Sequence, residues 1–193
     1  MGFDPTGGPP SVPAEERLNI FALVIYIPGP LGRFLDEARR DLVPHCNPHA
    51  HVSVLPPRPL AVDWQTAGEQ ARGLTQGWAP FEIELTGIQI FPVTDVIYIE
   101  VGAGAGELRR MHAAMNMGAL RFQEPFPYHP HVTLAQELPS QDVAAMHQLA
   151  QRRWKGFRGE RVFRAERAVF VENTLNDCWM DLAEYSLGAI AVR

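Results

Sequence analysis

The 193-residue chain is poor in cysteine, in surplus positive charge and in long apolar runs, and each shortage excludes a class of protein. Its two cysteines, Cys46 and Cys178, form neither a disulfide framework nor a pair with metal-ligand spacing, which favours a reducing, cytoplasmic location. A formal net charge of −5 provides no overall positive field for a long nucleic acid. No apolar run is long enough to span a bilayer, and the N-terminus lacks the pattern of a signal peptide.

What is present is the composition of a globular protein with one core. Hydrophobic residues make up 46% and charged residues 20%, and the length suits one sizeable core or two small lobes that share one. Residues 1–17 are rich in glycine and proline and are predicted to be a flexible tail. We therefore expect a single domain over residues 18–193. No glycine fingerprint follows the first apolar run, which disfavours a doubly wound nucleotide-binding fold.

Hydrophobic spacing predicts alternating strands and helices. The expected strands cover residues 19–27, 49–55, 81–91, 95–101, 131–135, 161–171 and 179–185. The expected helices cover residues 31–43, 63–77, 107–120 and 140–154, with Asp63 and Ser140 as N-caps. The Pro-Pro-Arg-Pro sequence at residues 56–59 is predicted to be a turn that ends the second strand.

Corresponding elements recur about 75–80 residues apart, so the chain is predicted to be a repeat. The two copies cover residues 18–92 and 93–193, and each has the order β-α-β-α-β. This pattern indicates an α+β fold with two antiparallel or mixed sheets, each backed by helices.

Two segments in corresponding places of the repeat carry the same kinds of residue. Residues 49–55 read HAHVSVL and residues 129–134 read HPHVTL, so His51 precedes Ser53, and His131 precedes Thr133, by two positions. Residues i and i+2 of a strand point to one face, so each motif directs an imidazole and a hydroxyl into one space. Two facing copies would surround a small anion such as a phosphate. Imidazoles exchange protons near neutral pH, and hydroxyls donate to phosphoryl oxygens.

A metal site is the main alternative. His49 with His51, and His129 with His131, form two His-x-His pairs, and His45 lies close by in the sequence. Such imidazoles could hold zinc or another transition metal, but no Asp or Glu lies in the motif strands to complete a catalytic site. Acid–base chemistry on a phosphate needs no metal, and we expect no metal and no other cofactor.

Other residues near the motifs have two interpretations each. Arg58 could bind a phosphate or be merely exposed in its turn. Tyr128 and Phe126 could stack on a base or belong to the core. Two further functions stay open, namely nucleotide or RNA binding with little catalysis, and an esterase with Ser53 as nucleophile. No Gly-x-Ser-x-Gly sequence surrounds Ser53, which disfavours the esterase.

At the paired motifs the chain resembles the 2H phosphoesterase superfamily, and within it the 2′-5′ RNA ligase-like proteins. The resemblance covers nearly the whole chain after residue 18, including the repeat and the separation of the motifs. It implies a bilobal, pseudo-twofold fold around a central cleft. It also implies a metal-independent phosphodiesterase that hydrolyses the 2′,3′-cyclic phosphate or 2′-5′ linkage of a nucleotide or RNA end, with weak 2′-5′ joining as a side reaction.

Carried over to this sequence, the resemblance implies that His51 and His131 are catalytic and that Ser53 and Thr133 bind the phosphate. Ser53 stands where many members have threonine, and the turn at residues 56–59 differs from the Phe-Leu-Gly found in many ligase-like members. The chemistry is therefore better defined than the substrate. The expected partner is a nucleotide or RNA end with a cyclic phosphate or 2′-5′ linkage; we expect no membrane association, and no protein partner is evident from the sequence.

Overall fold

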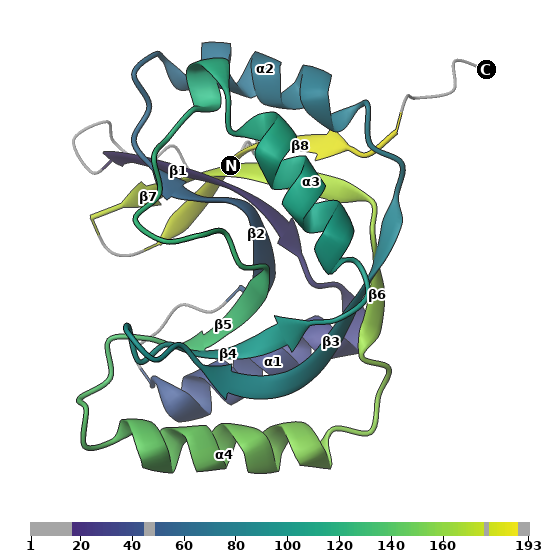
Figure 1. Cartoon of the computed structure of the whole chain (residues 1–193). Helices are drawn as coiled ribbons and strands as arrows, with labels where there is room; N and C mark the ends of the chain where they lie inside the picture. The colour runs from purple at the N-terminus through teal and green to yellow at the C-terminus, as the bar shows by residue number, and fades with distance from the viewer. Residues whose placement is uncertain (1–16, 45–48, 176–177, 189–193) are drawn as a thin grey trace, which may run out of the picture.

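A computed structural model describes residues 17–44, 49–175 and 178–188 (Figure 1). The expectation of a flexible tail over residues 1–17 lies outside these ranges except at Arg17, where the first strand begins. The elements in chain order are β1 (Arg17–Tyr26), α1 (Gly29–Leu42), β2 (His51–Arg58), α2 (Trp64–Thr75), β3 (Phe81–Ile90), β4 (Ile97–Val101), α3 (Ala105–Met115), the 3-10 turn η2 (Gly118–Leu120), β5 (His131–Ala135), α4 (Val143–Gly156), β6 (Val162–Ala165), β7 (Arg167–Thr174) and β8 (Trp179–Ser186).

The strands form two four-stranded sheets, with the orders β2-β1-β7-β8 and β5-β4-β3-β6. Every pair of neighbouring strands is antiparallel. The predicted α+β class with two helix-backed sheets is therefore confirmed, and the sheets are antiparallel rather than mixed. In both sheets the strand that carries the histidine motif, β2 or β5, lies at an edge.

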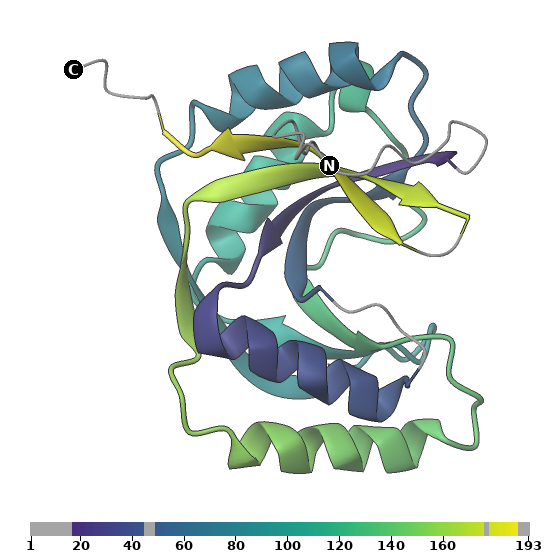
Figure 2. The ribbon, with the colours of Figure 1, turned by 180° about the vertical axis from the view of Figure 1, so that it is seen from behind.

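The two halves of the chain exchange elements. The first half contributes β3 to the second sheet, and the second half contributes β7 and β8 to the first sheet. Helices cross as well, because α1 packs against β5 and α4, whereas α3 packs against β2 and α2 (Figures 1 and 2). The lobes therefore do not coincide with residues 18–92 and 93–193, and one buried cluster extends through both.

Three local predictions need correction. Strand β2 continues to Arg58, which pairs with Phe21, instead of ending at a turn. Proline lacks an N–H donor, but an edge strand pairs on one side only and tolerates it. The single strand expected over residues 161–171 is interrupted at Glu166, and its parts, β6 and β7, belong to different sheets. Helix α4 begins after Asp142, without a side-chain cap, so Ser140 is not its N-cap.

Other expectations are confirmed. The Asp63 side chain accepts a hydrogen bond from the Thr66 N–H and caps α2. The predicted apolar face of α1 is buried, with Leu35 fully inaccessible. Strand β5 has the predicted bounds. In the described ranges, no helix has the length and apolar character needed to cross a membrane.

Candidate active site

The two motifs lie on neighbouring edge strands. Strands β2 and β5 are adjacent although 80 positions separate His51 from His131 (Figure 1). Both strands begin with the same burial pattern, in which the histidine and the hydroxyl residue are half-buried and the residue between them is buried. The alternation predicted for each motif is thus confirmed, and each imidazole shares a face with its hydroxyl.

The two imidazoles are held in the same way. Nδ1 of His51 lies 2.7 Å from the carbonyl oxygen of His49, and Nδ1 of His131 lies 2.6 Å from that of His129. A carbonyl oxygen only accepts, so the proton of each ring must be on Nδ1. Each neutral ring therefore keeps a lone pair on Nε2, and within the described residues no partner occupies either Nε2.

The hydroxyls of Ser53 and Thr133 are also available. Neither side chain makes a hydrogen bond to another residue in the part of the chain that the structure describes. A hydroxyl can donate one hydrogen bond and accept two, so both groups can bind an anionic oxygen. The site therefore offers two basic nitrogens and two hydroxyl donors.

The neighbours of the two histidines differ. In the β1–β2 pair, Tyr26 lies opposite His51, whereas in the β4–β5 pair Glu100 lies opposite His131. Tyr26 stacks on the His49 ring with 3.5 Å between centroids, and its hydroxyl donates to Asp181 Oδ1 at 2.5 Å. The corresponding Glu100 instead places Oε2 2.9 Å from His129 Nε2.

Burial is the main influence on the pKa values of both histidines. The pKa of His51 is lowered to about 4, mainly by burial and also by the positive charges of Arg39, His49 and His131, whereas the hydrogen bond to the His49 carbonyl opposes the shift. Burial also lowers the pKa of His131, but the carboxylate of Glu100 opposes that shift. His131 is among the charged groups that lower the pKa of His51, and the strands that carry the two rings, β2 and β5, pack against each other.

Arg58 does not lie at an open surface. Only 2% of the residue is exposed, and Nε donates to the Pro56 carbonyl at 2.9 Å. Nη1 donates to Asn116 Oδ1 at 2.9 Å and to the Leu120 carbonyl at 3.0 Å, while Nη2 forms an ion pair with Glu124. The structure therefore gives no support to the prediction that Arg58 binds a phosphate, because its donors are occupied inside the protein.

The two aromatic candidates lie in different surroundings. Tyr128 is half-buried, one face of its ring stacks on His112, and its hydroxyl donates to the Ser53 carbonyl. Phe126 is 53% exposed, so base stacking by Phe126 stays a prediction.

Two residues beside the motif histidines, Glu100 and Tyr26, were not found from the sequence. The only signal was their place on the strand before each motif, and that signal requires knowledge of the register.

The metal alternative has little geometric support. In the described ranges no three His, Cys, Asp or Glu residues are grouped as metal ligands, and His45 lies outside those ranges. His129 contacts Glu100, and His49 stacks on Tyr26.

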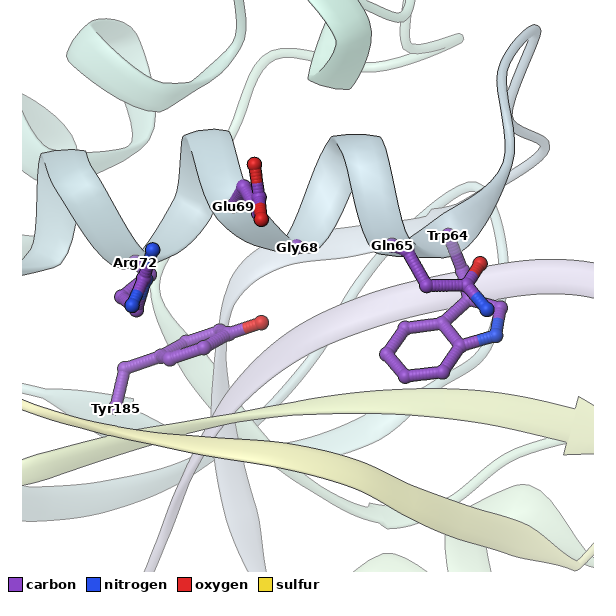
Figure 3. Close-up of a pocket in the computed structure, with 6 residues that line it drawn as sticks. All are labelled: Trp64, Gln65, Gly68, Glu69, Arg72 and Tyr185. Atoms are coloured by element: carbon purple, nitrogen blue, oxygen red, sulfur yellow. The ribbon is translucent and has the colours of Figure 1, made fainter.

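A cavity of about 220 Å³ lies between α2 and β8, away from the two motifs. Its lining residues include Trp64, Gly68 and Tyr185, and neither motif contributes to it (Figure 3).

The fold and the site together define a two-lobed α+β protein with a histidine–hydroxyl motif on one edge strand of each sheet, the arrangement of a 2H phosphoesterase. The chain matches the 2′-5′ RNA ligase superfamily over residues 27–177 and belongs to that superfamily. The family expected from the motifs is thus confirmed.

Individual relatives agree with this assignment. The RNA 2′,3′-cyclic phosphodiesterase of Aeropyrum pernix is 39% identical over 75 residues, which span 36% of this chain and 43%, less than half, of that protein. The structure of TT0787 of Thermus thermophilus aligns with a TM-score of 0.62 at 20% identity, over 88% of this chain and 98% of that one. E. coli LigT complexed with 3′-AMP gives 0.58 at 14% identity, over 89% and 98%. At these identities the structural matches establish the fold alone.

Proposed function

We propose that this protein is a metal-independent phosphodiesterase that hydrolyses the 2′,3′-cyclic phosphate or 2′-5′ linkage of a nucleotide or RNA end. The observation that carries the proposal is the paired geometry of His51 and His131, each with Nδ1 on a carbonyl and Nε2 available beside a hydroxyl. The two cysteines in the sequence fit a cytoplasmic location.

Hydrolysis requires one proton acceptor and one proton donor on opposite sides of the phosphorus. Nε2 of one neutral imidazole takes a proton from water as the water oxygen bonds to phosphorus. The bond from phosphorus to a ribose oxygen breaks, and Nε2–H of the other, protonated imidazole gives its proton to that oxygen. Ser53 and Thr133 donate to the non-bridging oxygens, where negative charge is concentrated.

The unlike neighbours support an assignment of the two roles. His51 has its pKa lowered to about 4, so it is neutral at physiological pH and is the base. Burial lowers the pKa of His131 as well, but the carboxylate of Glu100 opposes that shift, and for this reason we assign His131 as the acid. The phosphate of a bound substrate favours the protonated ring further.

The relatives support this class of substrate. One is named an RNA 2′,3′-cyclic phosphodiesterase, and the structure of another holds 3′-AMP. Joining of RNA ends would be the same chemistry in reverse, with a 5′-hydroxyl in place of water. The net charge of −5 offers little attraction for long RNA, so hydrolysis by the far more concentrated water should dominate.

The test is turnover of a 2′,3′-cyclic nucleotide in excess chelator, with His51→Ala and His131→Ala as variants. We expect wild-type activity to survive the chelator, and each variant to lose about 10²–10⁴-fold in kcat, because each removes one proton transfer. The double variant should be little worse than either single one. His147→Ala, on α4 and outside both motif strands, is the matched control and should keep full activity.

Each alternative predicts a different result in this experiment. Activity that is lost in chelator and restored by zinc would indicate a metal site at the paired histidines. Binding of 3′-AMP without turnover would indicate a nucleotide-binding protein. Near-full activity in His131→Ala would contradict the paired mechanism and leave Ser53 as the candidate nucleophile.

A further inference from the structure

The segment that leads into the second motif has no regular secondary structure, yet side chains hold it in place. Residues 121–130 connect η2 to β5, and Tyr128 lies three positions before His131. The backbone N–H of Phe122 donates to Asn116 Oδ1 at 2.8 Å, and Asn116 Nδ2 donates to the Phe122 carbonyl at 3.1 Å. Helix α3 thus fixes the start of the segment.

Tyr128 joins this segment directly to the first motif. Its hydroxyl donates to the backbone carbonyl of Ser53 at 2.7 Å. Its ring lies parallel to that of His112 on α3, with 4.0 Å between centroids and 1° between the planes. Burial raises the pKa of the Tyr128 phenol, so it remains a neutral donor throughout the working range of pH.

The Ser53 carbonyl has no partner within its own sheet. The Ala50 carbonyl accepts from Ile27 N–H at 2.9 Å and therefore points toward the β1 side. Backbone groups alternate in direction along a strand, so the carbonyl of Ser53, three positions later, points to the open edge of β2. An unpaired carbonyl at a partly buried edge needs a donor, and Tyr128 supplies it from the lead-in to β5.

His112, on which the Tyr128 ring stacks, is in turn held by a chain of charged groups. Glu124 Oε1 accepts from His112 Nε2–H at 2.9 Å and pairs with the buried guanidinium of Arg58. Arg58 belongs to β2, His112 to α3, and Glu124 to the lead-in segment. A buried guanidinium needs an opposite charge and a full set of acceptors, so the position of Glu124 is tightly specified. These contacts thus link the segment before β5 to β2, the first motif strand.

We propose that Tyr128 is a positioning residue, seated by His112, Glu124 and Arg58, that sets the separation and register of the two motif strands. This inference rests on the proposed function, in which both motifs act on one phosphate. The four residues connect β2 to the lead-in of β5 at two places, the Ser53 carbonyl and the Arg58 guanidinium. Arg58, which the sequence offered as a phosphate ligand, acts through this chain instead.

The expected effect is catalytic because reacting groups tolerate little displacement. A shift of about 1 Å in a reacting group can cost about a hundredfold in rate. Without the tie at Ser53, β2 and β5 are edge strands with no hydrogen bonds between them. We expect loss of this hydrogen bond to allow a displacement of that order between the two motifs.

The experiment compares Tyr128→Phe with Tyr185→Phe on a 2′,3′-cyclic nucleotide. Tyr128→Phe keeps the stacked ring and removes only the hydroxyl, so we expect kcat to fall about tenfold with KM within about twofold. Tyr185 is a buried tyrosine that faces the cavity beside α2, and its hydroxyl has no hydrogen-bond partner among the described residues (Figure 3). Tyr185→Phe should therefore keep wild-type kcat.

Glu124 provides a second pair of variants. Glu124→Gln keeps an oxygen that accepts from His112 and Arg58, whereas Glu124→Ala removes it. We expect kcat to fall in both, and to recover by about tenfold or more in Gln relative to Ala. Circular dichroism and the urea midpoint show whether each protein is folded, so that kcat is compared for folded protein only.

A second measurement separates failure of this inference from failure of the proposed function. NMR titration of the His51 and His131 imidazoles reports their mutual influence without any substrate. In Tyr128→Phe we expect a small rise in the pKa of His51 as His131 moves away, because burial, the main cause of the lowered pKa, remains. If Tyr128→Phe retains kcat within twofold of wild type, or if the wild type proves inactive and the two imidazole titrations are unchanged by the substitution, the positioning role is wrong. An inactive wild type with altered titrations would overturn only the proposed function.

Discussion

At the scale of single residues, the site is symmetric in its backbone contacts and asymmetric in its charges. Each motif histidine donates Nδ1–H to the carbonyl two residues earlier, so the same local geometry directs both Nε2 atoms away from that carbonyl. The strand next to each motif then supplies a different group, Tyr26 beside His51 and Glu100 beside His131. The proposed mechanism needs unlike surroundings for an acid and a base, and the difference between Tyr26 and Glu100 would contribute to them.

The pH dependence of kcat/KM follows from these surroundings. It reports the free enzyme, so its acid limb should fall near the pKa of His51, about 4, as the base becomes protonated. Its alkaline limb should lie below the usual range of histidine titration, because burial lowers the pKa of His131 and the acid loses its proton as the pH rises. A bell-shaped profile measured from pH 3 to 9 checks both limbs.

Replacement of Glu100 by Gln should move only the alkaline limb. The carboxylate raises the pKa of His131, so its removal should lower that pKa and shift the alkaline limb to lower pH. The acid limb, set by His51, should stay in place. Glu69→Gln, an exposed position on α2, is the matched control. A shift of the acid limb instead would mean that the two histidines have the opposite roles.

At the scale of helices and strands, periodicity in the sequence located the elements but could not assign them to sheets. The apolar spacing of α1 and the alternation in β5 are local properties, and both predictions are confirmed. The passage of β2 through Pro56 and Pro57 depends on β2 being an edge strand, which is a tertiary fact. The interruption at Glu166 likewise occurs because the chain leaves one sheet for the other.

The site shows the same limit. His51, Ser53, His131 and Thr133 could be found because the motif is repeated. The buried contacts of Arg58 could not be predicted, because its partners Glu124 and Leu120 are more than sixty positions away in sequence. Contacts of that range depend on the completed fold, and no local pattern encodes them.

Helix α1 stabilises the second sheet, although the strands before and after it in sequence, β1 and β2, belong to the first sheet. It follows β1 but packs against β5 and α4 of the other sheet, with Leu35 fully buried. Leu35→Ala should lower the free energy of unfolding by about 2–5 kcal/mol, because it removes transfer energy and leaves a cavity. Glu37→Ala, an exposed position on α1, should change it by less than about 0.5 kcal/mol. Urea unfolding followed by circular dichroism measures both, and equal effects would contradict this packing.

At the scale of the whole molecule, the exchange of strands and helices makes the lobes interdependent. The first sheet is incomplete without β7 and β8, and the second is incomplete without β3. Neither half of the chain contains all the strands of a sheet, and the buried cluster is continuous from one sheet to the other. We therefore propose that residues 18–188 fold as a single cooperative domain, which also keeps the two motifs in a fixed relation.

Unfolding should accordingly be a single transition in both lobes. Trp64 on α2 reports the first sheet and Trp154 on α4 reports the second, so two variants that each retain one of these tryptophans can follow the lobes separately. In each variant we expect the urea midpoint from tryptophan fluorescence to coincide, within error, with the midpoint from circular dichroism. Because every sheet needs strands from both halves, fragments 1–92 and 93–193 should each remain unfolded alone. Two separated transitions, or a folded fragment, would show that the lobes are independent. The separation of His51 and His131 would then depend on a mobile interface and not on a shared core.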